Sequence, residues 1–535
     1  MLKNLPFQQW TLGHVIRHQA ETRGDDAFLQ FETKAPVSYA EVDSISNRIA
    51  NGLIALGVRK GDKVATLLPN SIQSVCLWFG ISKTGAIDVP INIANKGYFL
   101  SHQLNDSDSS VFIIDVALLD RLTFIAKDLP KLKTVVVWSS DKISAEKPGS
   151  PFNTVQYDEL IAHNGVAPDV NVKSTEPQTL IYTSGTTGAA KGVLQSHAMI
   201  YLSAKEYIEA TQATAEDVFF TCLPIFHANA RILCLYPAMQ LGTKAVIHAR
   251  LSASNFWNQI KAAKATIFNS LGAMAHFIYS QPRKADDAEN PVRICAAFPM
   301  PGPIYEDFQK RFGLKVIEGY GLTEVAIITY NPFEGPKKGS CGKATKSFEV
   351  QIVDENDWPL ATGAVGEIVA RGRVPWATAL GYYNKPEKSL ELMRNHFFHT
   401  GDAGYLDEDG YLFFVDRIKD YIRRRGENIS SFEIEGVVVS HPQVAEAAAV
   451  SVKSELSEDE VKIVVVLRPD SRLASEALLD FCQQRMPYFA VPRYVEFVSK
   501  LPKTPNEKIQ KNKLRETGIN PATWDREKAG YQVKR

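Results

Sequence analysis

A cluster of hydroxyl side chains and glycines, followed by one lysine, is the segment of this chain whose residue types best suit a chemical task. The cluster consists of Thr183, Ser184, Gly185, Thr186, Thr187 and Gly188, and the lysine is Lys191. The apolar run 179–181, which predicts a strand, precedes the cluster. Glycines let backbone N–H groups converge, hydroxyls add donors, and a lysine offsets negative charge. We therefore predict that residues 183–191, here named the phosphate loop, bind a polyphosphate, although a flexible surface loop has a similar composition.

The phosphate loop differs from the Walker A loop of the P-loop nucleotide-binding proteins. A Walker A loop ends in Gly-Lys followed by Ser or Thr. Here Ala189 follows Gly188, and Gly192 follows Lys191. The chain is therefore not predicted to be a P-loop protein.

A second segment places an aromatic ring between two glycines and ends in a hydroxyl and a carboxylate. It reads Glu318, Gly319, Tyr320, Gly321, Leu322, Thr323 and Glu324. A tyrosine ring beside open backbone can stack on a base, and the oxygens of Thr323 and Glu324 are ligands that magnesium prefers. Taken alone, Tyr320 is also typical of a core aromatic residue.

Three later segments carry charged residues in surroundings that are typical of turns and linkers. The charged residues that we single out are Asp402, Arg417, Lys419 and Lys508. Taken singly, the Gly401-Asp402 pair is typical of a turn, and the run 416–420 is typical of a charged linker. The order of these segments along the chain carries more information than any one of them.

Taken together and in this order, the segments resemble the signature motifs of the adenylate-forming superfamily. That superfamily contains acyl-CoA synthetases, peptide-synthetase adenylation domains and luciferase-like enzymes. Further segments that fall in family order are 38–41, 61–64 and 223–227, so the resemblance covers nearly the whole chain. Two positions depart from the family pattern: Ala190 replaces the proline that usually precedes the lysine, and Glu507 replaces the glycine that usually precedes Lys508.

The resemblance implies how the nucleotide is held. The phosphate loop would bind the pyrophosphate part, Asp402 the ribose hydroxyls, and Arg417 the ribose or a phosphate. Glu324 and Thr183 would hold Mg²⁺. The implied ATP-binding residues are Thr183, Ser184, Gly185, Thr186, Thr187, Gly188, Lys191, Glu318, Gly319, Tyr320, Gly321, Thr323, Asp402 and Arg417. The implied catalytic residues are Lys508, Thr183, Glu324 and His227.

The resemblance also implies an acyl pocket, a hinge and a surface for CoA. The acyl pocket would be lined by His227, Ala228, Arg231, Asn269, Gly272, Ala273 and Val325. The hinge residue would be Lys419, and CoA would meet Gly426, Glu427 and Arg423. Arg231 is unusual on an otherwise apolar wall, and two interpretations stay open: it pairs with a second carboxylate of the substrate, or it forms a structural salt bridge.

The pattern of apolar residues predicts the elements that must position these segments. Short apolar runs alternate with helix-like stretches, which indicates an α/β fold. The expected strands include 64–68, 111–114, 135–138 and 245–247, and the expected helices include 44–56 and 74–84. Short strands with glycines around 347–415 predict a β-rich subdomain.

We predict two domains, because 535 residues are too many for a single core. The large N-terminal domain, residues 1–418, combines layered α/β sheets with the β-rich subdomain and holds the ATP and acyl sites. The small mobile α+β domain, residues 419–535, carries Lys508. Its expected elements are strands at 447–452 and 462–467 and a helix at 475–484.

The composition narrows the class of protein. Lys+Arg and Asp+Glu both total 60, so no overall charge draws the chain to nucleic acid or to anionic membranes. The six cysteines are scattered without a CxxC pair, which is typical of reduced core residues and not of a disulfide framework or a zinc site. No apolar run approaches the length of a membrane span, and no signal peptide or peroxisomal signal is evident, so we expect a cytoplasmic protein.

The resemblance implies a two-step ligase that uses ATP, Mg²⁺ and CoA. A carboxylic acid would be activated to an acyl-adenylate with release of pyrophosphate, and CoA would then displace AMP to give an acyl-CoA. The run 425–430 is faintly similar to carnitine/crotonobetaine-CoA ligases, and no substrate is predicted from it. The alternatives are an adenylating enzyme that loads a carrier-protein pantetheine, a luciferase-like oxygenase, and a non-catalytic nucleotide-binding regulator. A homodimer is possible.

Overall fold

The computed structural model describes most of the chain. The described residues are 5–139, 151–183, 190–420, 422–424, 427–429, 431–453, 459–486, 488, 490–504 and 507–533. Within these ranges the side chains of Ala273, Lys419, Arg423, Glu427, Asn428 and Glu433 are not described.

A seven-stranded sheet forms one half of the N-terminal region, with the strand order β7-β6-β5-β3-β4-β8-β9. Its strands are β3 (Lys63–Leu67), β4 (Ile87–Pro90), β5 (Val111–Asp115), β6 (Thr134–Trp138), β7 (Asn153–Gln156), β8 (Pro177–Thr183) and β9 (Lys191–Ser196). The pairs are parallel except for β8 with β9, which is antiparallel. The central strands are continuous apolar runs because helices cover both faces of the sheet.

A nine-stranded sheet forms the other half, with the strand order β16-β15-β14-β13-β12-β10-β11-β1-β2. Its strands are β1 (Ala27–Phe31), β2 (Val37–Ser38), β10 (Phe219–Thr221), β11 (Ala245–Ile247), β12 (Ile267–Ser270), β13 (Ile294–Ala297), β14 (Lys315–Leu322), β15 (Ala326–Tyr330) and β16 (Lys343–Ala344). The strands expected at 64–68, 111–114, 135–138 and 245–247 are confirmed as β3, β5, β6 and β11.

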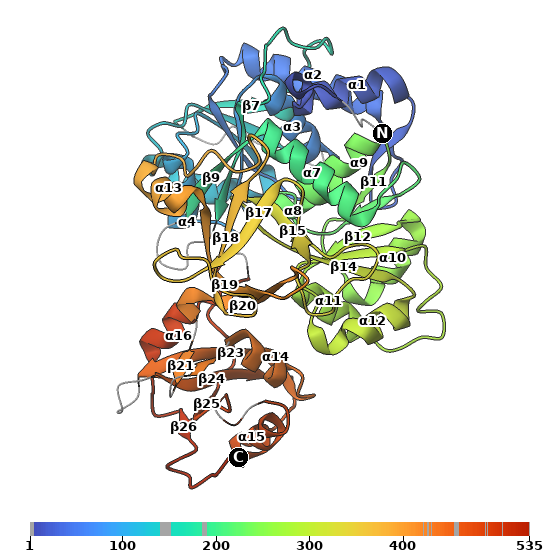
Figure 1. Ribbon diagram of the computed structural model, residues 1–535. Coiled ribbons are helices and arrows are strands. Elements are labelled where there is room, and N and C mark those ends of the chain that lie inside the picture. Colours follow the sequence, from blue (N-terminus) through green and yellow to red (C-terminus); the bar gives the residue numbers. More distant parts are fainter. Residues whose placement is uncertain are drawn as a thin grey trace.

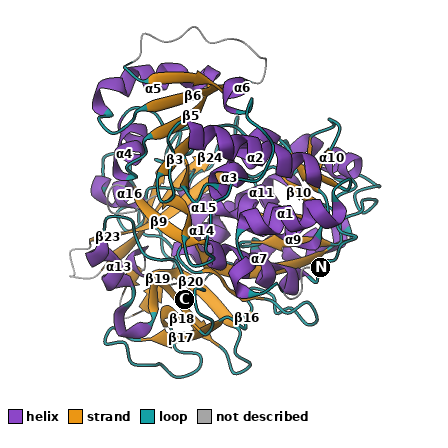
Figure 2. Ribbon diagram, turned by 90° about the horizontal axis from the view of Figure 1, so that it is seen from above, coloured by secondary structure: helices purple, strands orange, loops and turns teal. Residues whose placement is uncertain are grey.

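Helices separate the two large sheets and cover their outer faces (Figures 1 and 2). The longer helices are α1 (Leu12–Arg23), α2 (Tyr39–Ala55), α3 (Ile72–Lys83), α4 (Tyr98–Asp106), α7 (His197–Thr211), α10 (Phe256–Ala263), α11 (Gly272–Tyr279) and α12 (Tyr305–Phe312). Helix α3 is apolar on nearly every side, and one buried cluster joins its side chains to both sheets.

The two helices expected from apolar spacing exist but begin earlier than predicted. Helix α2 begins at Tyr39 because the Ser38 side chain accepts the N–H of Glu41, and the Glu41 side chain accepts the N–H of Ser38. Helix α3 begins at Ile72 through the same reciprocal arrangement of Ser71 and Ser74. Capping chemistry, and not the apolar pattern, sets these boundaries.

The predicted β-rich subdomain is confirmed as a four-stranded antiparallel sheet. Its strands are β17 (Phe348–Val353), β18 (Gly366–Gly372), β19 (Phe398–Leu406) and β20 (Leu412–Arg417), in that order across the sheet. The short helix α13 (Pro386–Leu392) precedes β19. Buried apolar residues of this sheet pack on residues that follow the second motif, so the subdomain is fixed against the edge of the nine-stranded sheet.

The C-terminal part of the chain forms a separate layer below the rest of the molecule in Figure 1. Its elements are β21 (Ile422–Arg424), β22 (Glu427–Ile429), α14 (Ser431–Val439), β23 (Val444–Lys453), β24 (Asp459–Leu467), α15 (Ser475–Gln483), β25 (Tyr494–Phe497), α16 (Lys511–Thr517) and β26 (Trp524–Asp525). Strands β23-β24-β25-β26 form one sheet with its own apolar cluster. The two expected strands and the expected helix are confirmed.

The predicted fold class is confirmed, because a large α/β region with a β-rich subdomain is joined to a small α+β region. All six cysteines are free, as expected. In the described part of the chain, no helix combines the length and the apolar character that crossing a bilayer requires.

Candidate active site

The phosphate loop begins and ends on two neighbouring antiparallel strands. Strand β8 ends at Thr183 and β9 begins at Lys191, and these two residues face each other across the ladder. His102 Nε2 lies 3.0 Å from the carbonyl oxygen of Ala190, so the position that departs from the family pattern is anchored to α4. The remaining residues predicted to bind phosphate lie outside the described residues: Ser184, Gly185, Thr186, Thr187 and Gly188.

Two glycines of the second motif stand where any side chain would collide. A Cβ at Gly321 would lie 1.7 Å from a backbone carbonyl oxygen of β15, and a Cβ at Gly319 would lie 2.8 Å from an aromatic ring. Between them, Tyr320 donates its hydroxyl to Asp402 Oδ2 at 2.6 Å. The structure therefore joins two of the predicted motifs, which are 82 residues apart, through one hydrogen bond.

Glu318, the first residue of the second motif, is a buried carboxyl. Its Oε1 accepts the backbone N–H of Met300 at 3.0 Å, whereas its Oε2 has no hydrogen-bond partner among the described residues. Burial raises the pKa of Glu318 to about 7, against the smaller opposing effect of the Met300 hydrogen bond. Glu318 is therefore expected to carry a proton below neutral pH.

We expect Glu318 to make the folded state less stable as the pH rises. Its pKa is about 7 in the folded protein and 4.5 ordinarily. Between these two pKa values the folded chain holds a proton that the unfolded chain has lost. The stabilisation from Glu318 is therefore complete below pH 4.5 and is lost as the pH rises through about 7, by up to about 3 kcal/mol. The Glu318→Gln variant should keep its thermal midpoint between pH 5 and 8 better than the wild type. The exposed Glu306→Gln is the matched control, and parallel pH profiles of Glu318→Gln and the wild type would contradict the assignment.

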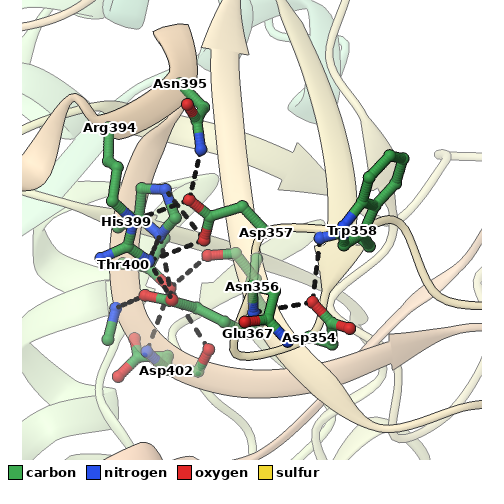
Figure 3. A network of polar contacts seen from close by, with 12 residues as sticks. Asp354, Asn356, Asp357, Trp358, Glu367, Arg394, Asn395, His399, Thr400 and Asp402 are labelled. Atoms are coloured by element: carbon green, nitrogen blue, oxygen red, sulfur yellow. Dashed lines mark hydrogen bonds and ion pairs between the residues drawn. The ribbon is translucent and has the colours of Figure 1, made fainter.

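Asp402 lies in β19, and Glu367 of β18 supports the backbone beside it (Figure 3). Glu367 Oε1 accepts the backbone N–H of Gly401 at 3.0 Å, and Glu367 Oε2 lies 2.9 Å from His399 Nδ1. Farther from the site, Asp357 accepts hydrogen bonds from the loop that precedes β19. This network fixes the backbone on which Asp402 stands.

Arg417 faces Asp402 from the adjacent strand. The two residues are paired in the β19–β20 ladder, and Arg417 Nε lies 3.4 Å from Asp402 Oδ1. Burial raises the pKa of the Asp402 carboxyl, and the charge of Arg417 and the hydrogen bond from Tyr320 oppose that rise. The predicted ribose contacts Asp402 and Arg417 are thus brought together.

Lys508 comes from the C-terminal region and lies among the charges of the N-terminal region. Desolvation by the surrounding protein, and then the charge of Arg417, lower the pKa of Lys508, while Glu324 and Asp402 raise it. The side chain keeps access to solvent, so water screens these effects in part. Burial first and Lys508 second lower the pKa of His227 to about 4, so the imidazole is neutral at pH 7.

The turn that carries Lys508 accommodates the second departure from the family pattern. Glu507 has a φ of +59°, in the left-handed region that favours glycine. The turn forms nevertheless, because Thr504 N–H donates to the Lys508 carbonyl at 2.8 Å and Lys508 N–H donates to Thr504 Oγ1 at 3.2 Å. The Glu507 side chain pairs with Lys503 at 3.3 Å. The glutamate therefore strains the backbone locally, by about 1–2 kcal/mol, without removing the turn.

The residues predicted to line the acyl pocket do not all share one environment. His227 and Ala228 lie where β10 leads into a helix, and both are partly exposed. Asn269 is buried and uses its amide, donating to Asn229 Oδ1 at 2.8 Å. Gly272 begins α11. Val325 is fully buried in the apolar cluster of the β-rich subdomain.

Arg231 is buried, and its side chain contacts three other residues. It forms an ion pair with Asp88 on β4, donates from Nε to the carbonyl of Ile225 at 2.5 Å, and stacks with its guanidinium 5.0 Å from the Trp78 ring. The Arg231 and Asp88 side chains are 4% and 0% exposed. Of the two interpretations left open by the sequence, the structural salt bridge agrees with this geometry.

Asp416 connects the two regions across the short 3₁₀ turn Ile418–Asp420, where the hinge was predicted. Its Oδ2 accepts the backbone N–H groups of Ser431 at 2.7 Å and of Phe432 at 3.3 Å, and it also accepts the Ser431 hydroxyl. A residue of β20 thus caps the N-terminus of α14, which lies beyond the turn.

The predicted CoA surface is described only in part. Gly426 lies outside the described residues, and for Arg423, Glu427 and Lys419 only the backbone is described. The neighbouring Arg424 is 2% exposed and pairs with Glu460 at 2.7 Å, so this arginine is structural.

Two family profiles match the chain. The profile of the AMP-binding enzyme matches residues 16–383, and that of the AMP-binding enzyme C-terminal domain matches residues 433–508. The chain belongs to the AMP-binding enzyme family. This AMP-binding enzyme is 31% identical over 503 residues to the crotonobetaine/carnitine–CoA ligase of Salmonella enteritidis PT4 (strain P125109), a match that covers 92% of this chain and 96% of that protein.

Solved structures resemble this AMP-binding enzyme over nearly its whole length. The anthranilate CoA ligase AuaEII in complex with anthranoyl-AMP has a TM-score of 0.86 at 26% identity, covering 96% of this chain and 98% of that one. The O-succinylbenzoate coenzyme A synthetase MenE from Bacillus subtilis, in complex with AMP, has a TM-score of 0.80 at 26% identity, covering 95% and 98%. The predicted superfamily is confirmed, and with it the reaction class of an AMP-forming acid–thiol ligase.

The sequence analysis of this AMP-binding enzyme missed Tyr382. Its hydroxyl donates to Glu324 Oε1 at 2.8 Å, and its ring lies 5.0 Å from the Lys191 ammonium. Glu367, which accepts the backbone N–H of Gly401 beside Asp402, was missed as well. These residues lie outside the motifs, and their roles depend on contacts between distant segments, so the only available signal was a pair of tyrosines after Gly381.

Proposed function

We propose that this AMP-binding enzyme joins a carboxylic acid to CoA in two steps. ATP first converts the acid to an acyl-adenylate with release of pyrophosphate, and the CoA thiol then displaces AMP. The observation that supports this most is that the charges of Glu324, Asp402 and Arg417, from the N-terminal region, act on Lys508, from the C-terminal region. Such a set of charges suits a reaction whose transition state accumulates negative charge on phosphate.

The residues present fit a magnesium ion. Magnesium in nucleotide sites is held by one or two protein oxygens together with substrate phosphates. Glu324 supplies a carboxylate and Thr183 a hydroxyl, and the described residues contain no cluster of three metal-ligating side chains that would indicate another metal. Glu324 and Thr183 would hold the ion, which when bound offsets phosphate charge. Lys508 stabilises the reacting oxygens, and Asp402 with Arg417 orients the ribose.

The second step requires a change of domain position. The domain 419–535 rotates about the segment that contains Lys419, withdraws Lys508 and presents Gly426, Glu427 and Arg423 to the pantetheine arm of CoA. Loading of a carrier-protein pantetheine is a less favoured alternative because the relatives named above are CoA ligases. A non-catalytic regulator is also not favoured, since the described catalytic positions keep their expected residue types.

The acid is proposed to carry a single carboxylate. Among the described lining residues, the one cation is Arg231, and it is already paired with Asp88. His227 is neutral at pH 7 because its pKa is about 4. A second carboxylate would therefore be buried without a partner, at a large cost in free energy.

The decisive experiment is acid-dependent exchange of labelled pyrophosphate into ATP, followed by AMP release with CoA. The panel should contain matched mono- and dicarboxylic acids of equal chain length. It should also contain the acids after which the relatives described above are named. We expect monocarboxylic acids to support exchange and free CoA to support AMP release. Silence across the panel would favour the regulator, and AMP release with an acyl-carrier protein but not with CoA would favour the carrier-loading enzyme.

A cytoplasmic location and a homodimer stay predictions. The location rests on the free cysteines, which suit a reducing compartment.

A further inference from the structure

Tyr382 touches two charged side chains that the proposed function places on the phosphates and on magnesium. Its hydroxyl donates to Glu324 Oε1 at 2.8 Å. On the ring face, the Lys191 ammonium lies 5.0 Å from the ring centroid, within the range of a cation–π contact. One side chain therefore links the carboxylate of the second motif to the lysine that closes the phosphate loop.

The backbone of Tyr382 is fixed to the strand that begins with Lys191. Tyr382 forms an antiparallel bridge with Val193, and the flanking hydrogen bonds join Leu194 N–H to the Gly381 carbonyl at 3.0 Å and Tyr383 N–H to a β9 carbonyl at 2.9 Å. The same segment reaches the second motif, because Ala379 N–H donates to the Glu324 carbonyl at 2.8 Å. The segment 379–383, here named the connecting segment, thus joins both motifs.

The residues after Tyr382 form further side-chain contacts that hold the connecting segment. The Tyr383 hydroxyl donates to Asp108 at 2.7 Å, and Lys385 pairs with Asp106 at 2.6 Å. Asp106 is the last residue of α4, and Asp108 follows two positions later. These side-chain contacts add to the backbone hydrogen bonds that already hold the segment 379–383 against β9 and the second motif.

The Tyr382 hydroxyl is a hydrogen-bond donor over the whole physiological range. Burial first, and then the charge of Glu324 and the hydrogen bond to it, raise the pKa of this phenol far above its usual value. The proton therefore stays on the phenol, and Glu324 Oε1 accepts the hydrogen bond. Among the described residues, none donates a hydrogen bond to the second carboxylate oxygen of Glu324, so this oxygen can meet another ligand.

We propose that Tyr382 is a positioning residue for the magnesium nucleotide: its hydroxyl fixes one oxygen of Glu324 so that the other meets the cation, and its ring holds the Lys191 ammonium beside the phosphates. The proposal rests on the function proposed above. It assigns separate tasks to the hydroxyl and to the ring, and these can be removed separately. Partners that orient a metal ligand commonly change metal affinity 10- to 100-fold when they are replaced, so an effect of about this size is expected.

The test measures binding and not turnover. Wild type, Tyr382→Phe and Tyr382→Leu are titrated with Mn²⁺ in the presence of a non-hydrolysable ATP analogue, with free Mn²⁺ followed by electron paramagnetic resonance. Calorimetry measures the analogue alone, without metal. Tyr382→Phe should weaken Mn²⁺ binding about 10- to 100-fold and leave metal-free binding of the analogue unchanged. Tyr382→Leu should weaken both, because Lys191 also loses its ring contact.

Tyr383→Phe is the matched control, since it removes a hydroxyl from the neighbouring tyrosine, one that donates to Asp108 and not to Glu324. It should bind Mn²⁺ and the analogue as the wild type does. Wild-type Mn²⁺ affinity in Tyr382→Phe would overturn the proposal. An equal loss of affinity for Mn²⁺ and for the analogue, accompanied by a lower thermal midpoint, would also overturn it, because that result indicates only a structural role. A wild-type protein that bound neither ligand would overturn this proposal and the proposed function together, whereas the first two outcomes leave the proposed function standing.

Discussion

Replacing Lys508 with alanine is expected to reduce acid-dependent pyrophosphate exchange by about 10²–10³-fold, the size of effect seen when one stabilising donor is removed from a reacting oxyanion. The same variant should release AMP from a supplied acyl-adenylate and CoA at a rate close to that of the wild type. In this structure Lys508 lies within the electrostatic reach of Glu324, Asp402 and Arg417, where ATP would react. For thioester formation the small domain is proposed to turn this lysine away, so the second step does not require it.

The exposed Lys513 provides the control for this prediction. Lys513 lies on α16, five positions after Lys508. Lys513→Ala removes a charge from the same domain without changing the site. This control should retain both half-reactions. Exchange at the wild-type rate in Lys508→Ala, or equal losses in the two half-reactions, would show that Lys508 does not have the proposed role.

Replacing Arg231 with methionine is expected to lower the free energy of unfolding by about 3–5 kcal/mol, the usual cost of leaving one partner of a buried ion pair behind. The Asp88 carboxylate is fully buried, and Arg231 supplies its charge partner. Burial raises the pKa of Asp88, which the charge and hydrogen bond of Arg231 oppose. Urea unfolding followed by circular dichroism, with the N-terminal transition fitted separately, provides the measurement.

A double variant distinguishes a structural arginine from a substrate-binding one. Arg231→Met combined with Asp88→Asn removes both charges together, so it should recover most of the stability that the single variant loses. The acid preference of the double variant should match that of the wild type. If Arg231→Met were as stable as the wild type but lost activity only towards dicarboxylic acids, Arg231 would be a substrate ligand after all.

The chemistry of the site could be predicted from the sequence to the extent that it depends on local motifs. Tyr320, Asp402 and Arg417 were recognisable because each stands in a short segment of fixed composition. Their mutual contacts were not recognisable, since the hydrogen bond between Tyr320 and Asp402 joins positions 82 residues apart. A sequence pattern shows which residue types are present, whereas the arrangement of the strands determines which of these residues are in contact.

Other features could not be predicted from the sequence for a different physical reason. Tyr382 is one of two adjacent tyrosines, and only the folded backbone of the connecting segment directs one hydroxyl to Glu324 and the other to Asp108. The assignment of Arg231 stayed open because a buried partner such as Asp88, 143 residues away, has no sequence signal. The beginnings of α2 and α3 were placed too late for the opposite reason, since their capping residues were visible but the apolar period was followed.

The cap that Asp416 provides to α14 has a consequence for the order in which substrates meet this protein. Rotation about the turn 418–420 must free the N–H groups of Ser431 and Phe432 from that carboxylate, and losing such a cap costs about 0.5–2 kcal/mol. By itself, that cost favours the state with Lys508 in place by a factor of about 2 to 30. A free enzyme is therefore set to receive ATP and the acid, and CoA is expected to be the last substrate to enter.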